Sequence, residues 1–415
     1  MEHQNRVFDV IVVGAGIMGS SAAYHLAKCS QNVLLLEQFD FLHQRGSSHG
    51  ESRTLRLTYP EPYYPGMVHE SLDLWEQAQL ESGLRVFTET RHLDLGPVEN
   101  RSLGAVIEVC RAKSMAHQLL DSKQVGELFQ QVFDLPENWV GLVTKGGFIK
   151  PTKAVSMFQS LAMRRGAILK DNTEVLDIER ESRGGGGGGG VRVISTKGMF
   201  TSKKCVVTVG AWASRLAKRV SGIELPIRPL HTTVGYWRVR PEFWPEFLPE
   251  NGFPTFACYD KDYIYGTPMS EFPGLVKIAL HGGYACDPDT RECTPDLASL
   301  EKVVGPWVRA LFRDRVEAEK PALGQACMYS MTPDEDFVID FFGGDFGKDV
   351  VLASGFSGHG FKMAPVVARV VTDLVLKGEA EGVELDYFKM RRFEDNPKGN
   401  PKVFEDQVSS YLESN

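Results

Sequence analysis

Apolar runs separated by glycine-rich turns give the chain a repeating order of strands and helices. The first run, Asp9-Val10-Ile11-Val12-Val13, has the composition of a buried strand, and residues Ser20 to Lys28 continue in helical period. A second apolar run, Val33 to Leu36, follows the helix and ends at Glu37. Strand, helix and strand in this order predict an α/β fold.

The same kinds of pattern recur later in the chain. Pro65 begins a predicted helix that Gly83 ends, and Gly166 closes another predicted helix. The segment from Pro226 to Lys320 favours strands and is rich in aromatic residues. Seven glycines from Gly184 to Gly190 predict a solvent-facing hairpin loop, to which we assign no function. Further predicted strands are Val175 to Arg180, Val191 to Ser195, Cys205 to Val209 and Val350 to Ala353, the last followed by a glycine-rich turn and a helix that ends at Gly378.

The turn after the first strand carries a dinucleotide-binding fingerprint. Gly14 permits the tight turn, Gly16 lets the backbone approach a pyrophosphate, and Gly19 allows the helix to pack closely on the strand. Glu37 lies 23 positions after Gly14, where its carboxylate can accept hydrogen bonds from a ribose. The alternative is an ordinary strand-turn-helix unit without a ligand, but strand, spacing, helix and acid all agree with the fingerprint. By itself, the fingerprint fits NAD or FAD.

Composition and charge narrow the class of protein. With 415 residues, of which 42% are hydrophobic, the chain can bury the cores of two domains. The formal net charge of -8 opposes attraction to nucleic acid and to anionic lipid, so we expect neither as a partner. No stretch near the N-terminus is long enough to span a bilayer, which predicts a soluble, intracellular protein. The seven cysteines form no C-x-x-C pair, and we predict no metal site.

Several motifs, in order along the chain, resemble the FAD-dependent amine oxidases of the D-amino-acid-oxidase superfamily, and most closely the sarcosine and L-pipecolate oxidases. The motifs are the fingerprint, Gly46-Ser47-Ser48-His49-Gly50-Glu51-Ser52-Arg53 with Arg56, Tyr263-Ile264-Tyr265-Gly266 followed by Lys277, Cys327-Met328-Tyr329-Ser330-Met331-Thr332-Pro333-Asp334-Glu335-Asp336-Phe337, and Gly355-Phe356-Ser357-Gly358-His359-Gly360-Phe361-Lys362. The resemblance covers nearly the whole chain. It implies a Rossmann-like FAD-binding domain and a substrate domain built on a mixed or antiparallel β-sheet. On this basis residues 1–86, 146–222 and 321–384 are assigned to the FAD-binding domain, 87–145 and 223–320 to the substrate domain, and 385–415 to a C-terminal tail.

The resemblance also implies that FAD is held covalently, through a thioether at Cys327. A thiolate there could attack the methyl carbon of the flavin ring, provided that nearby positive charge lowers its pKa. The alternative is a buried thiol that packs as a small hydrophobic group. The implied cofactor-binding residues are Gly14, Gly16, Ile17, Met18, Gly19, Glu37, Ser47, His49, Ser52, Arg53, Cys327, Gly355, Gly358, Gly360 and Lys362.

For the substrate, the resemblance assigns the carboxylate to Arg56 and Lys362. Arg53 would lie beside the flavin. Because Arg53 and Arg56 are three residues apart, they share a face in a helix and point oppositely in a strand, which the sequence leaves open. The alternative is that both arginines are surface charges on a loop. The implied substrate-binding residues are Arg56, Lys362, Tyr265 and Tyr329.

Lys277 interrupts an apolar run between Val276 and Ile278, so it faces either an edge or a buried site. The resemblance assigns the matching lysine to oxygen activation, where a fixed positive charge stabilises superoxide beside reduced flavin. An outward-facing lysine is the alternative, because strands alternate faces. The other implied catalytic residues are Arg53, His49, Tyr265 and His281, of which His281 could equally be a core aromatic residue.

The implied reaction is oxidation of a secondary amino acid, such as sarcosine or L-pipecolate, by FAD with O2 as acceptor and release of H2O2. We expect a monomer. One alternative is an FAD-linked dehydrogenase that uses another acceptor, and a second is a non-catalytic dinucleotide-binding regulatory protein. The resemblance implies a peroxisomal location, with the cytoplasm as the alternative because the chain ends Leu412-Glu413-Ser414-Asn415 and lacks a Ser-Lys-Leu type address.

Overall fold

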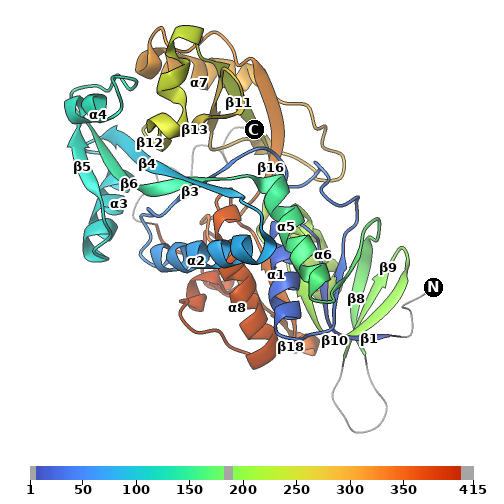
Figure 1. The fold of residues 1–415 in the computed structure, drawn as a ribbon. Coiled ribbons are helices and arrows are strands. Elements are labelled where there is room, and N and C mark those ends of the chain that lie inside the picture. Colours follow the sequence, from blue (N-terminus) through green and yellow to red (C-terminus); the bar gives the residue numbers. More distant parts are fainter. Residues whose placement is uncertain (1–5, 182–189, 403–415) are drawn as a thin grey trace.

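The computed structural model describes residues 6–181 and 190–402, which form two β-sheets with helices packed around them (Figure 1). Among these residues the first sheet has eight strands, namely β1 (Val7–Val13), β2 (Val33–Leu36), β7 (Ile168–Lys170), β8 (Val175–Glu181), β9 (Gly190–Ser195), β10 (Gly198–Val207), β17 (Val338–Gly343) and β18 (Gly347–Ser354). Their order is β17-β18-β10-β1-β2-β7, with β9 beside β10 and β8 beside β9. β1 pairs in parallel with β2 and β10, and β10 pairs in parallel with β18, so the carboxyl ends of these strands lie at one edge of the sheet.

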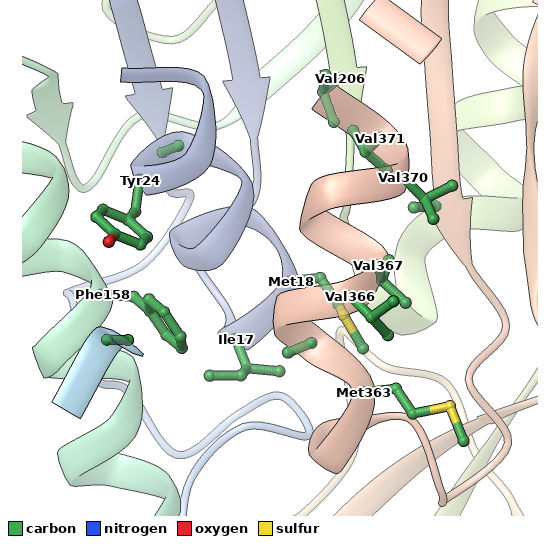
Figure 2. Close-up of a cluster of buried hydrophobic side chains, with 14 of the residues drawn as sticks. Ile17, Met18, Tyr24, Phe158, Val206, Met363, Val366, Val367, Val370 and Val371 are labelled. Carbon is green, nitrogen blue, oxygen red and sulfur yellow. The ribbon is translucent and has the colours of Figure 1, made fainter. Parts of the chain in front are cut away.

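Side chains of β1 alternate between two buried cores on opposite faces of this sheet. Val10 and Val12 point into a core covered by helices, whereas Ile11 and Val13 point into a core shared with β8, β9 and α6 (Ala213–Ser221). Figure 2 shows the helix-covered core, with side chains of α1, α5 and α8 packed together. The helices of this core are α1 (Ile17–Lys28), α2 (Tyr64–Ser82), α5 (Pro151–Arg164) and α8 (Ala364–Lys377).

The second sheet has ten strands among the described residues. They are β3 (Arg53–Arg56), β4 (Phe87–Pro97), β5 (Gln118–Asp121), β6 (Trp139–Ile149), β11 (Arg228–Arg238), β12 (Thr255–Tyr259), β13 (Tyr263–Phe272), β14 (Leu275–Leu280), β15 (Tyr284–Ala285) and β16 (Leu323–Met331). The order is β15-β11-β14-β13-β12-β4-β6-β3, with β16 beside β11 and β5 beside β6. β12 and β4 pair in parallel and the other pairs are antiparallel, so the sheet is mixed.

A helix that the sequence did not predict covers one face of the second sheet. α7 (Leu297–Phe312) lies inside the segment Pro226 to Lys320, where the sequence pattern favours strands. Gly305 and Pro306 within the helix weaken its sequence signal. The helix forms because its buried side chains, Leu300, Val304, Val308 and Leu311, recur at helical spacing and pack on the sheet. Two further helices, α3 (Arg101–Ala112) and α4 (Ser122–Leu128), lie beside the strands β4 to β6.

The predicted fold class is confirmed, since a Rossmann-like sheet with parallel central strands and antiparallel outer pairs accompanies a second mixed sheet. The helix predicted to end at Gly83 is α2, and Gly83 terminates it in the left-handed conformation with φ of 75°. The strands predicted on either side of the glycine run are β8 and β9, while Gly184 to Gly189 lie outside the described residues. Across the described part of the chain, no helix is both long and apolar enough to cross a bilayer.

The predicted domain boundaries are not tested by the sheets alone and stay a prediction. β3 and β16 fall within the segments predicted for the cofactor domain, yet both hydrogen-bond to strands of the second sheet. The two sheets are therefore joined through the segments that carry Arg53 and Cys327. This junction is where the predicted cofactor and substrate residues come together.

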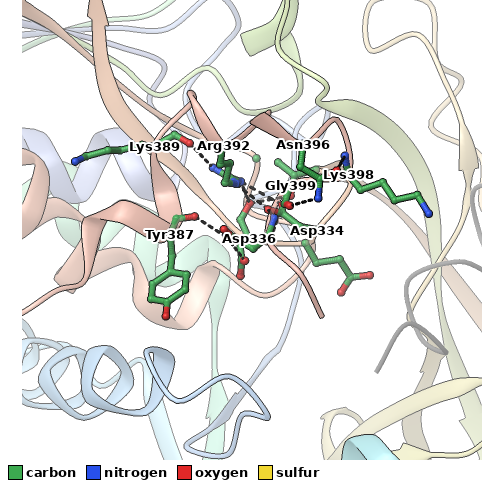
Figure 3. Close-up of polar contacts among 12 residues, drawn as sticks. Asp334, Asp336, Tyr387, Lys389, Arg392, Asn396, Lys398 and Gly399 are labelled. Atoms are coloured by element: carbon green, nitrogen blue, oxygen red, sulfur yellow. Dashed lines mark hydrogen bonds and ion pairs between the residues drawn. The ribbon is translucent and has the colours of Figure 1, made fainter. Parts of the chain in front are cut away.

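Residues beyond α8 pack against the turn Asp334-Glu335-Asp336 through buried polar contacts (Figure 3). Arg392, in α9 (Arg392–Asp395), donates to both oxygens of Asp334 at 2.7 and 3.2 Å. The side chains of Arg392 and Asp334 are only 6% and 0% exposed. Asp336 accepts from Lys402, Tyr63, Tyr64 and Asn400. The segment 385–402 is thus part of the packed molecule.

Replacing Arg392 by methionine should destabilise the protein by about 3 to 5 kcal/mol, because Asp334 would remain as a buried, unpaired carboxylate. Chemical denaturation measures this loss. The matched control is Lys123→Met, which removes an ion pair to Glu127 on side chains that are 85% and 60% exposed. That variant should change stability by less than about 1 kcal/mol. Equal effects of the two substitutions would contradict the role assigned to the buried pair.

Candidate active site

The glycine turn between β1 and α1 forms a backbone cradle with no room for side chains. Gly14 has φ of 93°, and a Cβ on it would lie 2.7 Å from the carbonyl oxygen of Thr208. A Cβ on Gly19 would lie 1.8 Å from the carbonyl oxygen of Gly14. Gly16 is the N-cap of α1 and has no side chain to cap the helix, although the Ile17 N–H donates to Ser48 Oγ at 3.0 Å. The remaining N–H groups of the first turn and the helix dipole face an open space suited to phosphate.

Glu37, directly after β2, hydrogen-bonds to the backbone of the glycine turn. Its Oε2 accepts from the Ala15 N–H at 2.8 Å, and its Oε1 accepts from the Phe39 N–H at 3.1 Å. The carboxylate therefore fixes the glycine turn as well as lining the space beside it. Its predicted contact with a ribose stays a prediction.

A cavity of about 300 Å³ runs along this edge of the first sheet. Its walls include most of the predicted cofactor residues: Gly14, Gly16, Ile17, Met18, Glu37, Ser47, His49, Arg53, Cys327, Gly358 and Gly360. Gly19, Ser52 and Gly355 lie outside the lining, and Lys362 lines a neighbouring cavity instead. The sequence did not single out Thr208 or Trp212, which also line the cavity. Both follow the carboxyl end of β10, and the parallel order of β1, β10 and β18 could have indicated them.

A second cavity, of about 150 Å³, adjoins the first. The two cavities share Arg53, Cys327, Tyr329, Gly358 and Phe361 in their walls. The predicted substrate residues Arg56, Lys362, Tyr265 and Tyr329 line the second cavity, as do Lys277 and His281. The structure thus brings the two predicted sets together, on either side of a common wall.

Arg53 links the loop before β3 to Cys327 at this common wall. Its guanidinium donates to the carbonyl oxygens of His49 at 2.6 Å and Ser47 at 3.2 Å, and to Cys327 Sγ at 3.4 Å. Burial raises the pKa of the Cys327 thiol, but the charge of Arg53 and the neighbouring His49 ring outweigh burial and lower it to about 6. Cys327 is therefore a thiolate at neutral pH, as a nucleophile requires.

The His49 ring lies beside the Cys327 sulfur, and its buried ring nitrogens have no oxygen or nitrogen hydrogen-bond partner within the described residues. Unpaired buried polar atoms are costly, and they are common where a ligand supplies the missing partner. The bare glycine cradle, the cavity beside it and these nitrogens together fit a dinucleotide whose ring end reaches Cys327. The residues present are therefore suited to hold FAD.

Lys277 is buried, which resolves the two alternatives left by the sequence. It lies on β14 between β11 and β13, is 2% exposed, and points away from the face that Val276 and Ile278 present to α7. Its Nζ donates to the carbonyl oxygen of Ser52 at 2.8 Å and to Ser52 Oγ at 3.0 Å. Burial and the charge of Arg53 lower the pKa of Lys277 to about 8.

Arg56 and Lys362 both approach the ring of Tyr59 in the second cavity. The Arg56 guanidinium lies 4.4 Å from the ring centroid and Lys362 Nζ lies 5.1 Å from it. Helix α2 holds the backbone of Lys362 in place, because the Lys362 carbonyl oxygen accepts hydrogen bonds from Trp75 and Ser71. Burial and the charge of Arg56 hold the pKa of Lys362 well below its ordinary value. Neither cation has a carboxylate ion-pair partner among the described residues, so together they form an anion site.

Tyr59 and His359 explain how this anion site is oriented. His359 Nε2 lies 2.9 Å from the carbonyl oxygen of Glu335, which can only accept, so this nitrogen carries the proton. Burial and the charge of Lys362 lower the pKa of His359, so the ring is neutral and its Nδ1 accepts from the Tyr59 hydroxyl at 3.0 Å. His359 is therefore a positioning group. Sequence analysis missed Tyr59, which carries no motif of its own.

The remaining walls of the second cavity are aromatic. The hydroxyls of Tyr265 and Tyr329 lie 3.4 Å apart, and the His281 ring lies 5.3 Å from the ring of Tyr329. His281 Nε2 also lies 3.9 Å from a carboxylate oxygen of Glu335, which the sequence did not single out. His281 thus lines the cavity and is not a core side chain. In the described part of the chain, no three His, Cys, Asp or Glu side chains are grouped as metal ligands.

A phosphate cradle, a thiolate beside it and an adjoining anion site define a flavin-dependent oxidoreductase. The chain belongs to the FAD-dependent oxidoreductase family (DAO), whose model matches residues 9–374. It is 56% identical over 405 residues to the probable sarcosine oxidase of Arabidopsis thaliana, covering 97% of this chain and 96% of that protein. It is 36% identical to the peroxisomal sarcosine oxidase of Homo sapiens, covering 95% and 98% of the two chains.

Solved structures show the same fold at lower sequence identity. NikD, an amino acid oxidase of nikkomycin biosynthesis, superimposes with a TM-score of 0.77 at 21% identity, covering 92% of this chain and 97% of NikD. The L-proline dehydrogenase of P. horikoshii gives a TM-score of 0.76 at 24% identity, covering 94% and 98%. The predicted family, cofactor FAD and class of enzyme are confirmed, while the individual residue roles stay predictions.

Proposed function

We propose that this enzyme oxidises the CH–NH bond of a small secondary amino acid, with O2 as the electron acceptor and H2O2 as a product. The observation that carries the proposal is the pair Arg56 and Lys362, which form an anion site in a cavity that adjoins the cofactor cavity. A planar guanidinium and an ammonium suit a carboxylate. The names of relatives at 56% and 36% identity, sarcosine oxidases, support the same substrate class.

The size and walls of the second cavity support a small, N-alkylated substrate. Its volume of about 150 Å³ is well below the roughly 300 to 1,000 Å³ of typical ligand pockets. Tyr59, Tyr265, Tyr329 and Phe361 give it aromatic surfaces that favour an N-methyl group or a substituted ammonium. When bound, FAD would accept two electrons from the substrate as a hydride equivalent. The protein's contribution is to orient the amine and to exclude water.

The role proposed for each cation follows from its place. Arg56 and Lys362 would hold the carboxylate, and Arg53, which contacts Cys327, would lie beside the flavin. Lys277 would place its positive charge where oxygen is reduced.

The segments 1–86, 146–222 and 321–384 would supply the cofactor site, and the segments 87–145 and 223–320 would supply the substrate side, as the sequence predicts. A monomeric enzyme in the peroxisome is our proposal too, supported by the names of relatives called monomeric and peroxisomal.

Purified enzyme should release H2O2 when it is given sarcosine, L-pipecolate or another small secondary amino acid in air. A steady-state panel of such amines, followed by a peroxide-coupled assay, measures this and ranks the substrates. A dehydrogenase of the same fold would turn over only with an artificial electron acceptor. A non-catalytic dinucleotide-binding protein would bleach its flavin with none of the amines, and that result would defeat the proposal.

We propose that Cys327 Sγ attaches FAD through a thioether: the C–S bond would replace a methyl C–H bond, the proton would leave to solvent, and O2, the acceptor proposed above, would take up the two electrons. Acid-precipitated wild-type protein should keep its yellow colour in the pellet, whereas Cys327→Ser should release all flavin to the supernatant. Because the thiol is deprotonated above about pH 6, covalent incorporation into flavin-free protein should slow as the pH falls below that value. The matched control is Cys29→Ser at an exposed position, which should behave as the wild type. A colourless wild-type pellet would exclude the linkage.

Lys277→Met should slow reoxidation of the reduced enzyme by roughly tenfold or more and leave flavin reduction nearly unchanged, because the charge acts in the oxygen step alone. Lys277 loses its proton as pH rises through about 8, so wild-type reoxidation should fall across this range while the variant shows a flat profile. Stopped-flow absorbance separates the two half-reactions. Lys145→Met, at an exposed ion pair, is the control. Equal slowing of both half-reactions would contradict the role.

A further inference from the structure

A buried polar chain lies behind the anion site and ends at Arg56. Asp94 and His92, both on β4, are 0% exposed. His92 Nε2 donates to Asp94 Oδ1 at 3.1 Å, and His92 Nδ1 lies 2.9 Å from the hydroxyl of Thr255 on the neighbouring strand β12. Thr58 Oγ1 donates to the other oxygen of Asp94 at 2.6 Å.

Thr58 connects this chain to the guanidinium. Arg56 Nη1 donates to the carbonyl oxygen of Thr58, two residues further along the chain. The side chain of Thr58 is thus anchored on Asp94 while its backbone oxygen holds Arg56. A shift of Thr58 would move the hydrogen-bond acceptor that sets the direction of the guanidinium.

Asp94 also supplies negative charge that acts on Arg56 and favours its charged form. Burial raises the pKa of Asp94, but the charges of His92 and Arg56 and the bond from Thr58 outweigh burial and lower it, so the carboxylate is ionised. The tyrosines around Arg56 are neutral, because burial raises the pKa of Tyr59, Tyr259 and Tyr263. Asp94 therefore balances a cation that faces a second cation, Lys362, across the cavity.

A polar network that served packing alone would not need an ionised group at this depth. Burying a carboxylate carries a large desolvation cost, and apolar side chains of similar volume stabilise a core at least as well. Each oxygen of Asp94 nevertheless has a donor, and one of these donors leads to Arg56. Fully connected buried networks fix the geometry of the groups that they support.

We propose that Asp94, acting through Thr58, is a positioning residue that orients Arg56 and balances its charge for binding the substrate carboxylate. The inference rests on the proposed function, in which Arg56 holds that carboxylate. Neither Asp94 nor Thr58 lines the substrate cavity, so both act through Arg56 and not by contact with the substrate.

Asp94→Asn and Thr58→Val each remove one interaction while keeping the shape of the side chain. Each should raise KM for the best secondary amino acid about tenfold, the factor expected for one hydrogen bond to a charged group, with kcat within about twofold of wild type. Thr58→Ser keeps the hydroxyl and should restore KM. The dissociation constant of propionate, followed by the change in flavin absorbance, should rise by the same factor, whereas that of neutral propionamide should not.

Two further measurements complete the design: the KM of the variant Arg56→Gln and the melting temperature of each variant. Arg56→Gln should raise KM at least as much as Asp94→Asn; if it leaves KM unchanged, the carboxylate site of the proposed function is wrong. If Arg56→Gln raises KM while Asp94→Asn and Thr58→Val leave KM and propionate binding unchanged, the inference alone is overturned. A lower melting temperature with unchanged KM would show that the network is only structural. If Asp94→Asn does not fold, the comparison of Thr58→Val with Thr58→Ser decides.

Discussion

Positive charge that the protein compensates only in part, at the junction of the two sheets, is the constraint on which the site depends. Arg53, Arg56, Lys277 and Lys362 converge on two adjoining cavities, and none has a carboxylate ion-pair partner among the described residues. Burying such charges is costly unless hydrogen bonds and anions offset them. Backbone carbonyl oxygens offset part of the cost here, and the Cys327 thiolate and the Asp94 carboxylate offset another part. The rest is left for ligands that carry negative charge.

The opposite arrangement occurs at the turn Asp334-Glu335-Asp336. Asp334 pairs with Arg392 (Figure 3), Asp336 pairs with Lys402, and tyrosine hydroxyls also donate to Asp336. Glu335 between them has φ of 59°, a strained conformation for a residue with a side chain, which the paired neighbours hold in place. Its carbonyl oxygen fixes the proton of His359, and His359 fixes Tyr59 under the two substrate-side cations. The aspartates of this turn, whose charges are fully paired, thus help to hold in place two cations that have no carboxylate ion-pair partner.

Sequence patterns predicted the elements whose structure is determined by residues close together in the chain. The strand, glycine turn and helix at Gly14 to Gly19 were predictable, because backbone geometry demands glycine there. The segment of α7 was not, because Gly305 and Pro306 obscured a helix that tertiary packing stabilises. Tyr59, Glu335 and Asp94 were missed for a related reason. Their roles come from contacts between residues far apart in the chain, which no spacing records.

The extended conformation of β3 explains how one short segment serves both cavities. Arg53 and Arg56 are three positions apart on a strand, so their side chains leave on opposite faces. Arg53 reaches Cys327, and Arg56 stacks on Tyr59. A helix would have placed both charges on one face, where they would repel each other and share one ligand. Because β3 hydrogen-bonds to β6 of the second sheet and carries Arg53 to the first cavity, the strand fixes the spacing between cofactor and substrate. The reaction therefore depends on backbone pairing at the junction as much as on the charges that the strand presents.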